Sequence, residues 1–361
     1  MMKIAITADA HLRGRLETPE RYVALENIFE QCQKEDVKKV LILGDLFDRD
    51  FNNYHDLDEL CSVYEELQIT MLPGNHDRGL KRKFFTARNI RVIEEPLLEK
   101  VNARLNFLFF PYEAETSLDE ALATFAKKNR VEGRFVLFGH GDWLSGMRQP
   151  NAYEGGFYMP LSRRALEKFN PLRAFLGHIH QTDFGADRMT AVVYPGSPCG
   201  LDINETGRRR FLLYDTEDNR LESRYVDTQV LYFKETLLAM PVEDEISRLQ
   251  GLIKKMVEGW ELTGTDLQKV RLRLAVRGFT RDKKTLSQFV RQEIAGYGIA
   301  FYDPEGPDFS DLRITSDESE TRLVIFKSFQ EKLKEVDLSR FHATSNEILE
   351  EAMQVIWGVK K

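Results

Sequence analysis

The chain has 361 residues, of which 42% are hydrophobic and 30% are charged, a composition typical of globular proteins. It excludes collagen-like, low-complexity and largely disordered proteins, and the length predicts two or three domains. The 51 Lys and Arg are outnumbered by 58 Asp and Glu, which gives a formal net charge of -7. No global field therefore attracts the chain to nucleic acid or anionic membranes, and any basic site must be local.

The three cysteines are scattered without CxxC spacing, so the sequence supports neither a disulfide framework nor a zinc knuckle. No stretch approaches the roughly 18 consecutive apolar residues that a membrane helix needs, and we find no secretory signal segment. We therefore expect a cytoplasmic protein without a membrane span.

Hydrophobic periodicity predicts alternating strands and helices in the first part of the chain. The expected strands are 3–7, 39–43 and 69–72, and the expected helices are 19–34 and 57–67. A strand-rich continuation follows, with a strand pair that includes 104–110, a helix opened by a capping box at 117–120, and strands at 134–138, 172–176, 191–194 and 211–214. This order predicts a layered α/β domain over residues 1–227.

After Asp227 the pattern predicts a smaller α+β domain over residues 228–303. Helical spacing covers 241–258 and 284–294, and strand patterns cover 270–276 and 299–302. Residues 304–318 combine Pro-containing turns with acidic residues, which predicts a linker. Two helices, at 320–336 and 345–357, form an expected C-terminal helical tail over residues 319–361.

Five of the seven histidines lie in short clusters directly after strand-like runs. These clusters are Asp9-Ala10-His11, Gly44-Asp45-Leu46-Phe47-Asp48, Gly74-Asn75-His76-Asp77, Gly139-His140 and Gly177-His178-Ile179-His180. Since open α/β folds bind ligands at the carboxyl ends of their strands, we expect these side chains to converge on one sheet edge. The remaining histidines, His55 and His342, lie outside every cluster and are expected on the surface or in loops.

The residue types in these clusters suit a pair of divalent metal ions. Two such ions, about 3.5 to 4 Å apart, repel each other, and a bridging carboxylate relieves the repulsion. Asp45 is the expected bridge. The other ligands divide into Asp9, His11 and His180 for one ion and Asn75, His140 and His178 for the other. Mixed nitrogen and oxygen ligands suit Mn²⁺ or Fe²⁺, with Zn²⁺ and Mg²⁺ as further possibilities, and such a centre activates water for attack on a phosphate ester.

The motifs DxH, GDxxD, GNHD, GH and GHxH, in this order from Asp9 to His180, resemble those of the calcineurin-like metallophosphoesterases. The resemblance implies a β-sandwich flanked by helices, and it makes the seven residues above metal ligands. It further implies that His76 is the general acid at the leaving oxygen and that Asp77 orients the His76 ring. Such positioned proton transfer contributes about 10² to 10⁴-fold to a rate.

Two features beside these motifs leave their roles open. Asp48 is expected next to the metal ligands in a hydrogen-bonding role rather than as a ligand. The segment Tyr194–Pro198 resembles one that follows the last metal motif in one branch of the family, and the alternative is a simple turn.

The region from Lys269 to Arg291 carries eight basic residues and one acidic residue. Within 270–277 apolar and basic positions alternate, so a strand there would present its arginines on one face. We expect a nucleic-acid backbone to bind Arg271, Arg273, Arg277, Arg281, Lys283 and Lys284. The alternative is a solvated strand face that prevents aggregation.

The order of phosphoesterase domain, small α+β cap and helical tail resembles the SbcD-type nucleases of double-strand-break repair. That resemblance implies a manganese-dependent exonuclease or endonuclease acting on DNA ends, a homodimer, and an SbcC-type coiled-coil ATPase as partner. The two C-terminal helices either dock on that ATPase or pack on their own domain. A small-molecule phosphodiesterase or phosphatase on the same metal core is the alternative function, and a non-catalytic DNA-end-binding subunit is the third.

Overall fold

The computed structural model describes residues 2–51, 53–131, 133–144, 156–183, 191–242, 244–315, 321–336 and 345–357. They form two compact units, of which the first comprises residues up to Leu201 together with Arg208–Gln229. The second comprises Asp202–Gly207 and the residues from Val230 onward. The sequence pattern assigned 202–207 to the first domain, but the Gly207 N–H donates to the Tyr232 carbonyl of the second unit at 2.9 Å.

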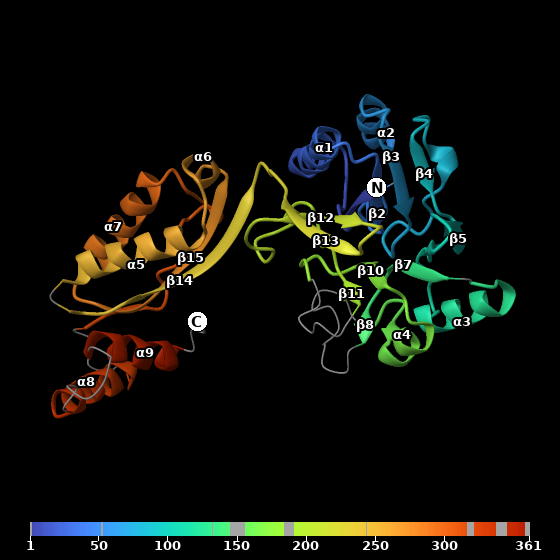
Figure 1. The fold of residues 1–361 in the computed structure, drawn as a ribbon. Helices are drawn as coiled ribbons and strands as arrows, with labels where there is room; N and C mark the ends of the chain where they lie inside the picture. The colour runs from blue at the N-terminus through green and yellow to red at the C-terminus, as the bar shows by residue number, and fades with distance from the viewer. Residues whose placement is uncertain are drawn as a thin grey trace. The chain divides into compact units, whose positions relative to one another are not determined.

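The first unit is built on two β-sheets, most of whose strands are labelled in Figure 1. The six-stranded sheet has the order β13-β12-β1-β2-β3-β4, and the five-stranded sheet has the order β11-β10-β7-β6-β5. The strand bounds are β1 Lys3–Thr7, β2 Lys39–Leu43, β3 Gln68–Leu72, β4 Ile90–Val92, β5 Leu97–Lys100, β6 Leu105–Phe109, β7 Arg134–His140, β10 Arg173–Gly177, β11 Val192–Val193, β12 Arg210–Asp215 and β13 Arg220–Tyr225. A separate pair joins β8 Trp143–Leu144 to β9 Leu161–Ser162. The layered α/β architecture expected from the sequence is confirmed.

Parallel pairing puts the carboxyl ends of several strands at the same edge of each sheet. Strands β1 to β4 are parallel to one another, and so are β6, β7, β10 and β11. The helices of this unit are α1 Pro19–Lys34, α2 His55–Val63, α3 Leu118–Lys128 and α4 Arg163–Phe169, with a 3₁₀ turn at Arg82–Phe84. Helix α3 begins with the predicted capping box, in which Ser117 and Glu120 exchange side-chain to backbone hydrogen bonds.

The inner faces of the two sheets share one apolar core. Residues of β1 and β2 in one sheet and of β6, β7 and β10 in the other are buried in the same cluster. The Phe138 ring stacks on Phe109 and Phe175, with centroid distances of 5.0 and 5.5 Å. Alternate residues of the five-stranded sheet face away from this core and pack with α3 and α4. Burial on both faces holds the strand ends, and the loops that follow them, in fixed positions.

The second unit contains a sheet whose described pairings are all parallel, with the order β14-β15-β16 and β17 also on β15. Its elements are β14 Leu231–Ala239, α5 Glu245–Gly259, α6 Gly264–Leu267, β15 Val270–Thr280, α7 Lys283–Gly296, β16 Ala300–Phe301, β17 Leu312–Ile314, α8 Thr321–Lys334 and α9 Ser345–Trp357. The apolar residues of β15 alternate as predicted, and they pack with α5 and α7 in one core.

The expected linker over residues 304–318 needs correction for its described part, which ends at Thr315. Strand β17 pairs with Gly278–Thr280, and Asp308 exchanges backbone hydrogen bonds of 2.8 Å with Leu274 and Val276. Backbone hydrogen bonds to β15 hold this segment on the sheet. Because the segment has no periodic run of apolar residues, its sequence showed no sign of a strand and predicted a linker. Residues 316–318 lie outside the described residues.

The two C-terminal helices pack on the second unit. The rings of Phe326 in α8 and Trp357 in α9 lie 6.0 and 4.9 Å from the ring of Phe279 in β15. Apolar residues of both helices are buried in the same cluster with Leu238 and Met240. Of the two alternatives for the tail, packing on its own unit is therefore observed. Some apolar positions stay exposed, among them Ile325 and Val355.

Within the part of the chain that the structure describes, no helix is both long enough and apolar enough to cross a lipid bilayer.

Candidate metal centre

The five histidine-containing motifs lie at the carboxyl ends of five strands. Three of these strands, β1, β2 and β3, belong to the six-stranded sheet, and β7 and β10 belong to the five-stranded sheet. The sequence predicted a single sheet edge, whereas the motifs are divided between two facing sheets whose carboxyl ends meet. A site assembled this way can surround a ligand from two sides.

The backbone turns sharply directly after these strands. Asp9, His11 and Asp45 have φ values of 55°, 46° and 47°, and His178 has a φ of 96°. These angles fall in the left-handed region, which non-glycine residues seldom adopt and which is concentrated at functional sites. The Asp9 N–H donates to the Gly44 carbonyl at 3.0 Å, and the His11 N–H donates to the Asp45 carbonyl at 2.9 Å. These bonds hold the first two motifs against each other.

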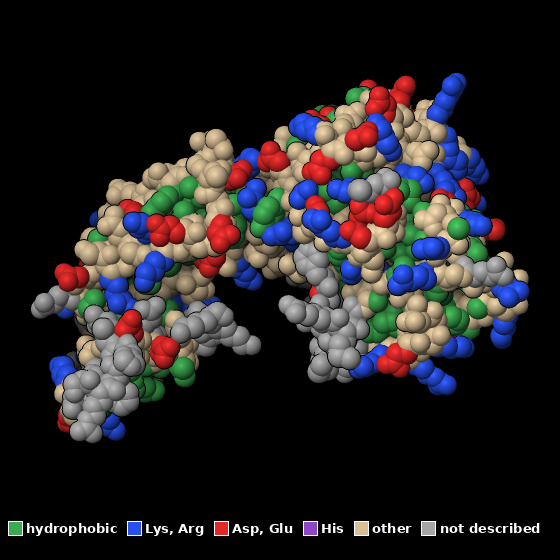
Figure 2. Space-filling view, in the orientation of Figure 1, with side chains coloured by type: hydrophobic (Ala, Val, Ile, Leu, Met, Phe, Trp, Pro, Cys, Tyr) green, Lys and Arg blue, Asp and Glu red, His purple; other side chains and the backbone are tan. Residues whose placement is uncertain are grey.

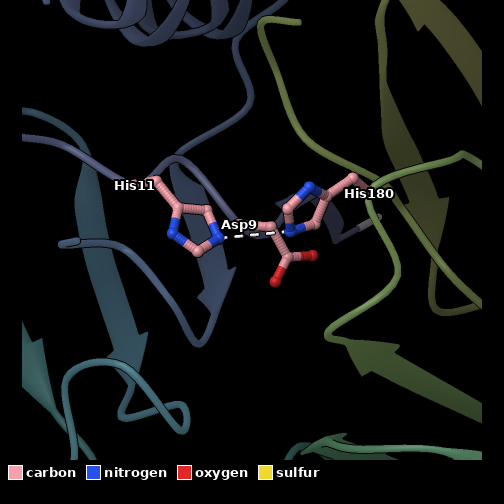
Figure 3. A group of neighbouring side chains, drawn as sticks. All are labelled: Asp9, His11 and His180. Atoms are coloured by element: carbon pink, nitrogen blue, oxygen red, sulfur yellow. Dashed lines mark hydrogen bonds between the residues drawn. The ribbon is translucent and has the colours of Figure 1, made fainter. Parts of the chain in front are cut away.

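Asp9, His11 and His180 form the first cluster, in which the two imidazole rings face each other beside the carboxylate (Figure 3). The Nε2 atoms of His11 and His180 are 3.2 Å apart, and one ligand atom of each residue lies within 4.8 Å of the others. Asp9 Oδ1 accepts the His178 N–H at 2.9 Å, whereas the buried Asp9 Oδ2 accepts no hydrogen bond from the described residues. A metal ion fits this donor set, because it satisfies both nitrogens and the buried oxygen together.

Asp45, His140 and His178 form a second cluster, which Asn75 joins. His140 Nδ1 lies 2.9 Å from the Leu43 carbonyl, so His140 Nε2 is the nitrogen that meets Asn75 Oδ1 at 2.8 Å and Asp45 Oδ2 at 3.4 Å. A histidine fixed through one nitrogen to a carbonyl is the usual arrangement for a metal ligand. This donor set also fits a divalent ion.

Asp45 connects the two clusters. Its Oδ2 lies 3.9 Å from His11 Nε2 in the first cluster and 3.4 Å from His140 Nε2 in the second. Its Oδ1 accepts the His76 N–H at 2.8 Å, which fixes the carboxylate. This is the position that a bridging carboxylate requires.

The electrostatics of the clusters favour bound positive charge. Burial opposes ionisation of Asp45, but the charge of His140 and the other nearby imidazoles outweighs it, so the pKa of Asp45 lies well below its usual range. Burial alone would lower the pKa of His140, yet Asp45 and Asp9 raise that pKa to about 9. Burial raises the pKa of Asp9. The buried carboxylates therefore need nearby cations, and divalent ions supply such charge.

The Asp77 carboxylate binds backbone groups of two loops. Its carboxylate accepts the N–H groups of Leu46 and Phe47 at 2.9 and 3.1 Å and that of Gly74 at 2.6 Å, so both of its oxygens are bonded to backbone donors. Burial and the charge of Asp45 raise the pKa of Asp77 to about 6. Asp77 therefore joins the loops after β2 and β3, and its expected orienting role at His76 stays a prediction.

Asp48 is the carboxylate that faces His76. Its Oδ1 lies 3.6 Å from His76 Nδ1 and 3.9 Å from His11 Nδ1, and these interactions hold the pKa of Asp48 well below its usual range. The His76 side chain is 15% exposed, so it borders the buried clusters and stays open to solvent. The Asp48 carboxylate therefore lies within 4 Å of a ring nitrogen of both His76 and His11.

The motif glycines permit close approach of the ligands. A Cβ at Gly177 would lie 1.8 Å from the Leu43 carbonyl oxygen and 2.7 Å from His140 Nδ1. A Cβ at Gly44 would lie 2.1 Å from His140 Nδ1, and one at Gly74 would lie 2.2 Å from Asp45 Oδ1. Any side chain at these positions would displace the neighbouring ligands.

Sequence reasoning missed Asp142. Its Oδ2 lies 3.7 Å from His178 Nε2 and accepts the Tyr158 N–H at 2.7 Å, and the side chain is buried. The only sequence feature that could have indicated Asp142 is its place two positions after His140. An acidic residue at such a spacing is too common to indicate a site by itself.

The six basic residues expected to bind nucleic acid lie in the second unit and differ in their surroundings. Arg273 forms two hydrogen bonds with Asp303 at 2.9 and 3.0 Å, and Lys283 Nζ donates to the carbonyls of Phe309 and Leu312 at 2.7 and 3.0 Å. Ion pairing and carbonyl contacts also engage Arg277 and Arg271. Arg281 and Lys284 are exposed.

On the face of the second unit that Figure 2 presents, acidic side chains lie among the basic ones. The charge of this unit is thus partly neutralised within the unit itself, and fewer basic residues remain for a partner than the sequence predicted.

The profile of the calcineurin-like phosphoesterase family matches residues 2–190, which is more than half of the chain. Histidine and aspartate clusters that could hold metal ions lie at the strand ends of this two-sheet fold, and the chain belongs to the calcineurin-like phosphoesterase family. Members of this family are metallophosphoesterases, whose fold uses a dinuclear metal site, and the two clusters described above could hold metal ions.

Among curated proteins, the chain is similar to YhaO of Bacillus subtilis strain 168, described as an uncharacterized metallophosphoesterase. The two are 23% identical over 253 residues, which cover 63% of this chain and 60% of YhaO. The matched region therefore spans less than two thirds of the length of that relative.

Three solved structures each cover 62% of this chain. TT1561 of Thermus thermophilus is matched over 98% of its chain, with 15% identity and a TM-score of 0.40. A novel archaeal phosphodiesterase is matched over 100%, with 17% identity and a TM-score of 0.34. GAP50, the anchor in the inner membrane complex of Plasmodium, is matched over 84%, with 11% identity and a TM-score of 0.41. These scores are low, so the family assignment rests on the sequence profile.

The contacts of Gly177 generate a stability prediction. Gly177→Ala should lower the free energy of unfolding of the metal-free protein by about 1 to 3 kcal/mol, because the added Cβ overlaps the Leu43 carbonyl and His140. Urea denaturation of the purified variant measures this change. The matched control is Gly79→Ala, where an added Cβ meets no atom within 4 Å. Equal stability of the two variants would contradict the packing described here.

Proposed function

We propose that this metallophosphoesterase is a dinuclear-metal-dependent nuclease that hydrolyses phosphodiester bonds at DNA ends. The position of Asp45 carries the catalytic part of the proposal, because one carboxylate lies within 4 Å of nitrogens from both ligand clusters. The proposed ligands are Asp9, His11 and His180 for one ion, Asn75, His140 and His178 for the other, and Asp45 for both. When bound, the two ions would supply Lewis acidity and an activated water for attack on phosphorus.

His76 is the proposed general acid. It follows Asn75 directly, its backbone N–H is bonded to Asp45, and its ring lies 4.7 Å from that of His11. Asp48 Oδ1 stands 3.6 Å from His76 Nδ1. Partial exposure gives His76 access to the leaving oxygen of a substrate at the edge of the centre. The protein's own contribution is thus to hold a proton beside the scissile bond.

The choice of DNA as substrate is supported by the resemblance to SbcD-type nucleases and by the exposed basic residues Arg281 and Lys284. Manganese as the native metal, a homodimer and an SbcC-type ATPase partner follow from the same resemblance and remain predictions. The internal contacts of Arg273, Arg277 and Lys283 favour the alternative function, a phosphodiesterase or phosphatase for small molecules on the same metal core. In that case the second unit would have no role in binding DNA.

Cleavage of end-labelled linear duplex DNA tests the proposal. We expect shortening of the DNA with Mn²⁺, none with EDTA, and a loss of about 10² to 10⁴-fold in rate for His76→Ala. His55→Ala is the matched control, since His55 is exposed at the start of α2.

Turnover of a chromogenic phosphodiester without cleavage of DNA would contradict the nuclease proposal and favour a small-molecule substrate. Equal rates for His76→Ala and His55→Ala would contradict the role of His76.

A second prediction separates DNA binding from structural roles within the second unit. Lys284→Ala should weaken DNA binding and reduce the slope of log K against log salt by about 1, because one exposed phosphate contact is lost. Lys283→Ala removes the neighbouring lysine, whose Nζ is bonded to two carbonyls, and should lower stability instead. DNA titrations at several salt concentrations and urea denaturation measure the two effects. An unchanged salt slope for Lys284→Ala would contradict this assignment.

A further inference from the structure

The Nε2 atoms of His11 and His180 face each other at 3.2 Å. The backbone carbonyls of these two histidines also share one feature, a hydrogen bond from an arginine side chain. The His11 carbonyl accepts a hydrogen bond from the guanidinium of Arg21, and the His180 carbonyl accepts one from the guanidinium of Arg209. Each of the two histidines therefore has an arginine bound to its own backbone carbonyl.

Arg209 forms part of a closed set of hydrogen bonds around His180. Its side chain donates to Ser197 Oγ at 2.6 Å and to the Ser197 carbonyl at 3.3 Å, while the Ser197 N–H donates to the His180 carbonyl at 2.9 Å. The His180 carbonyl thus accepts two donors, as many as its lone pairs allow. Arg209 is only 4% exposed, so these bonds are shielded from competing water.

This set explains the segment Tyr194–Pro198, whose role the sequence left open. Gly196 has a φ of 77°, and a Cβ there would lie 2.7 Å from the His180 carbonyl oxygen. The turn at Gly196 therefore brings Ser197 onto His180 at a distance that only glycine permits. The segment is a support for the loop that carries His180 rather than a simple turn.

Arg209 itself is anchored to the six-stranded sheet. It directly precedes β12, which pairs antiparallel with β1 so that Ile6 faces Leu212 and Lys3 faces Asp215. The Arg209 carbonyl accepts the Val226 N–H at 3.0 Å, which fixes its backbone. Arg209 thus links His180, at the end of the five-stranded sheet, to the strand pair that carries Asp9.

Arg21 holds the other histidine from helix α1. Its side chain is 14% exposed, and the next residue, Tyr22, donates its hydroxyl to the Arg13 carbonyl at 2.6 Å. Two consecutive side chains of α1 therefore fix the backbone of the loop after β1 on either side of Leu12.

We propose that Arg21 and Arg209 are positioning residues for the metal site formed by Asp9, His11 and His180. A metal ion binds nitrogen at about 2.0 to 2.2 Å, so two facing imidazoles serve as ligands only when their backbones are held closely in place. A planar guanidinium with a fixed set of donors provides such a hold better than a flexible amine. The inference rests on the proposed ligand assignment, and it predicts that loss of either arginine weakens one metal site selectively.

Mn²⁺ titration by calorimetry, with electron paramagnetic resonance of the bound ions, tests this proposal. The wild-type protein should bind two ions per chain and give the signal of a coupled pair. Arg209→Met should keep one ion and bind the second about 10 to 100-fold more weakly, with the signal of an isolated ion, because metal affinity depends to this extent on groups that support the ligands. Arg210→Met is the matched control, since the partners of Arg210 are Ser223 and Tyr225 of β13.

Circular dichroism and thermal unfolding without metal establish whether each variant is folded. If Arg209→Met does not fold, Ser197→Ala replaces it, because this variant removes one hydroxyl from the hydrogen-bond set and keeps the arginine. Ser197→Ala should weaken the same single site by a smaller factor. Arg21→Met should weaken that site as well, through His11.

Wild-type affinity at both sites in these folded variants would overturn the proposal, and so would equal weakening of both sites, which indicates a general structural role. If the wild-type protein itself does not bind two ions, the ligand assignment fails, and this inference fails with it.

Discussion

The carboxylate of Asp45 is buried between the carboxyl ends of two sheets. Burial disfavours its ionised form, and neighbouring hydrogen-bond donors and imidazoles stabilise that form. An ionised carboxylate in such a place is stable only beside cations or strong hydrogen-bond donors. The His76 N–H binds one of its oxygens, and imidazoles from both ligand clusters surround the other. The core between the sheets keeps these groups together, because packed phenylalanines fix the strands from which the loops emerge.

Each motif combines a ligand with a backbone feature that permits its position. The glycines at 44, 74 and 177 remove side chains that would overlap His140, Asp45 or the Leu43 carbonyl, and several ligands adopt left-handed backbone angles. Strain of this kind costs about 1 to 3 kcal/mol per residue and persists only where surrounding contacts enforce it. Asp77 provides some of these contacts, because it joins the loops after β2 and β3 through hydrogen bonds. At His180 the hydrogen bonds of Arg209 and Ser197 provide them. The positions of the proposed ligands therefore depend on contacts with residues outside the ligand set.

Sequence reasoning succeeded where the signal was local. Strands β1 and β2, helix α1 and the capping box of α3 were predicted from short runs of residues, and the ligand motifs stood out because each follows such a strand. It did not find what depends on partners distant in the chain. Strand β17 is held by backbone bonds to β15, Asp77 accepts a hydrogen bond from Leu46 across 31 positions, and Arg209 reaches His180 across 29 positions. The second unit shows the same limit, since the regular spacing of its arginines did not reveal that Asp303 and Asp311 accompany two of them.

Anomalous diffraction from crystals of the protein grown with Mn²⁺ tests most directly the claim that Asp45 joins two metal sites. We predict two anomalous peaks about 3.5 to 4 Å apart. One should be bound by Asp9, His11 and His180, the other by Asn75, His140 and His178, with Asp45 in contact with both. A single peak, or two peaks of which Asp45 contacts only one, would contradict the account.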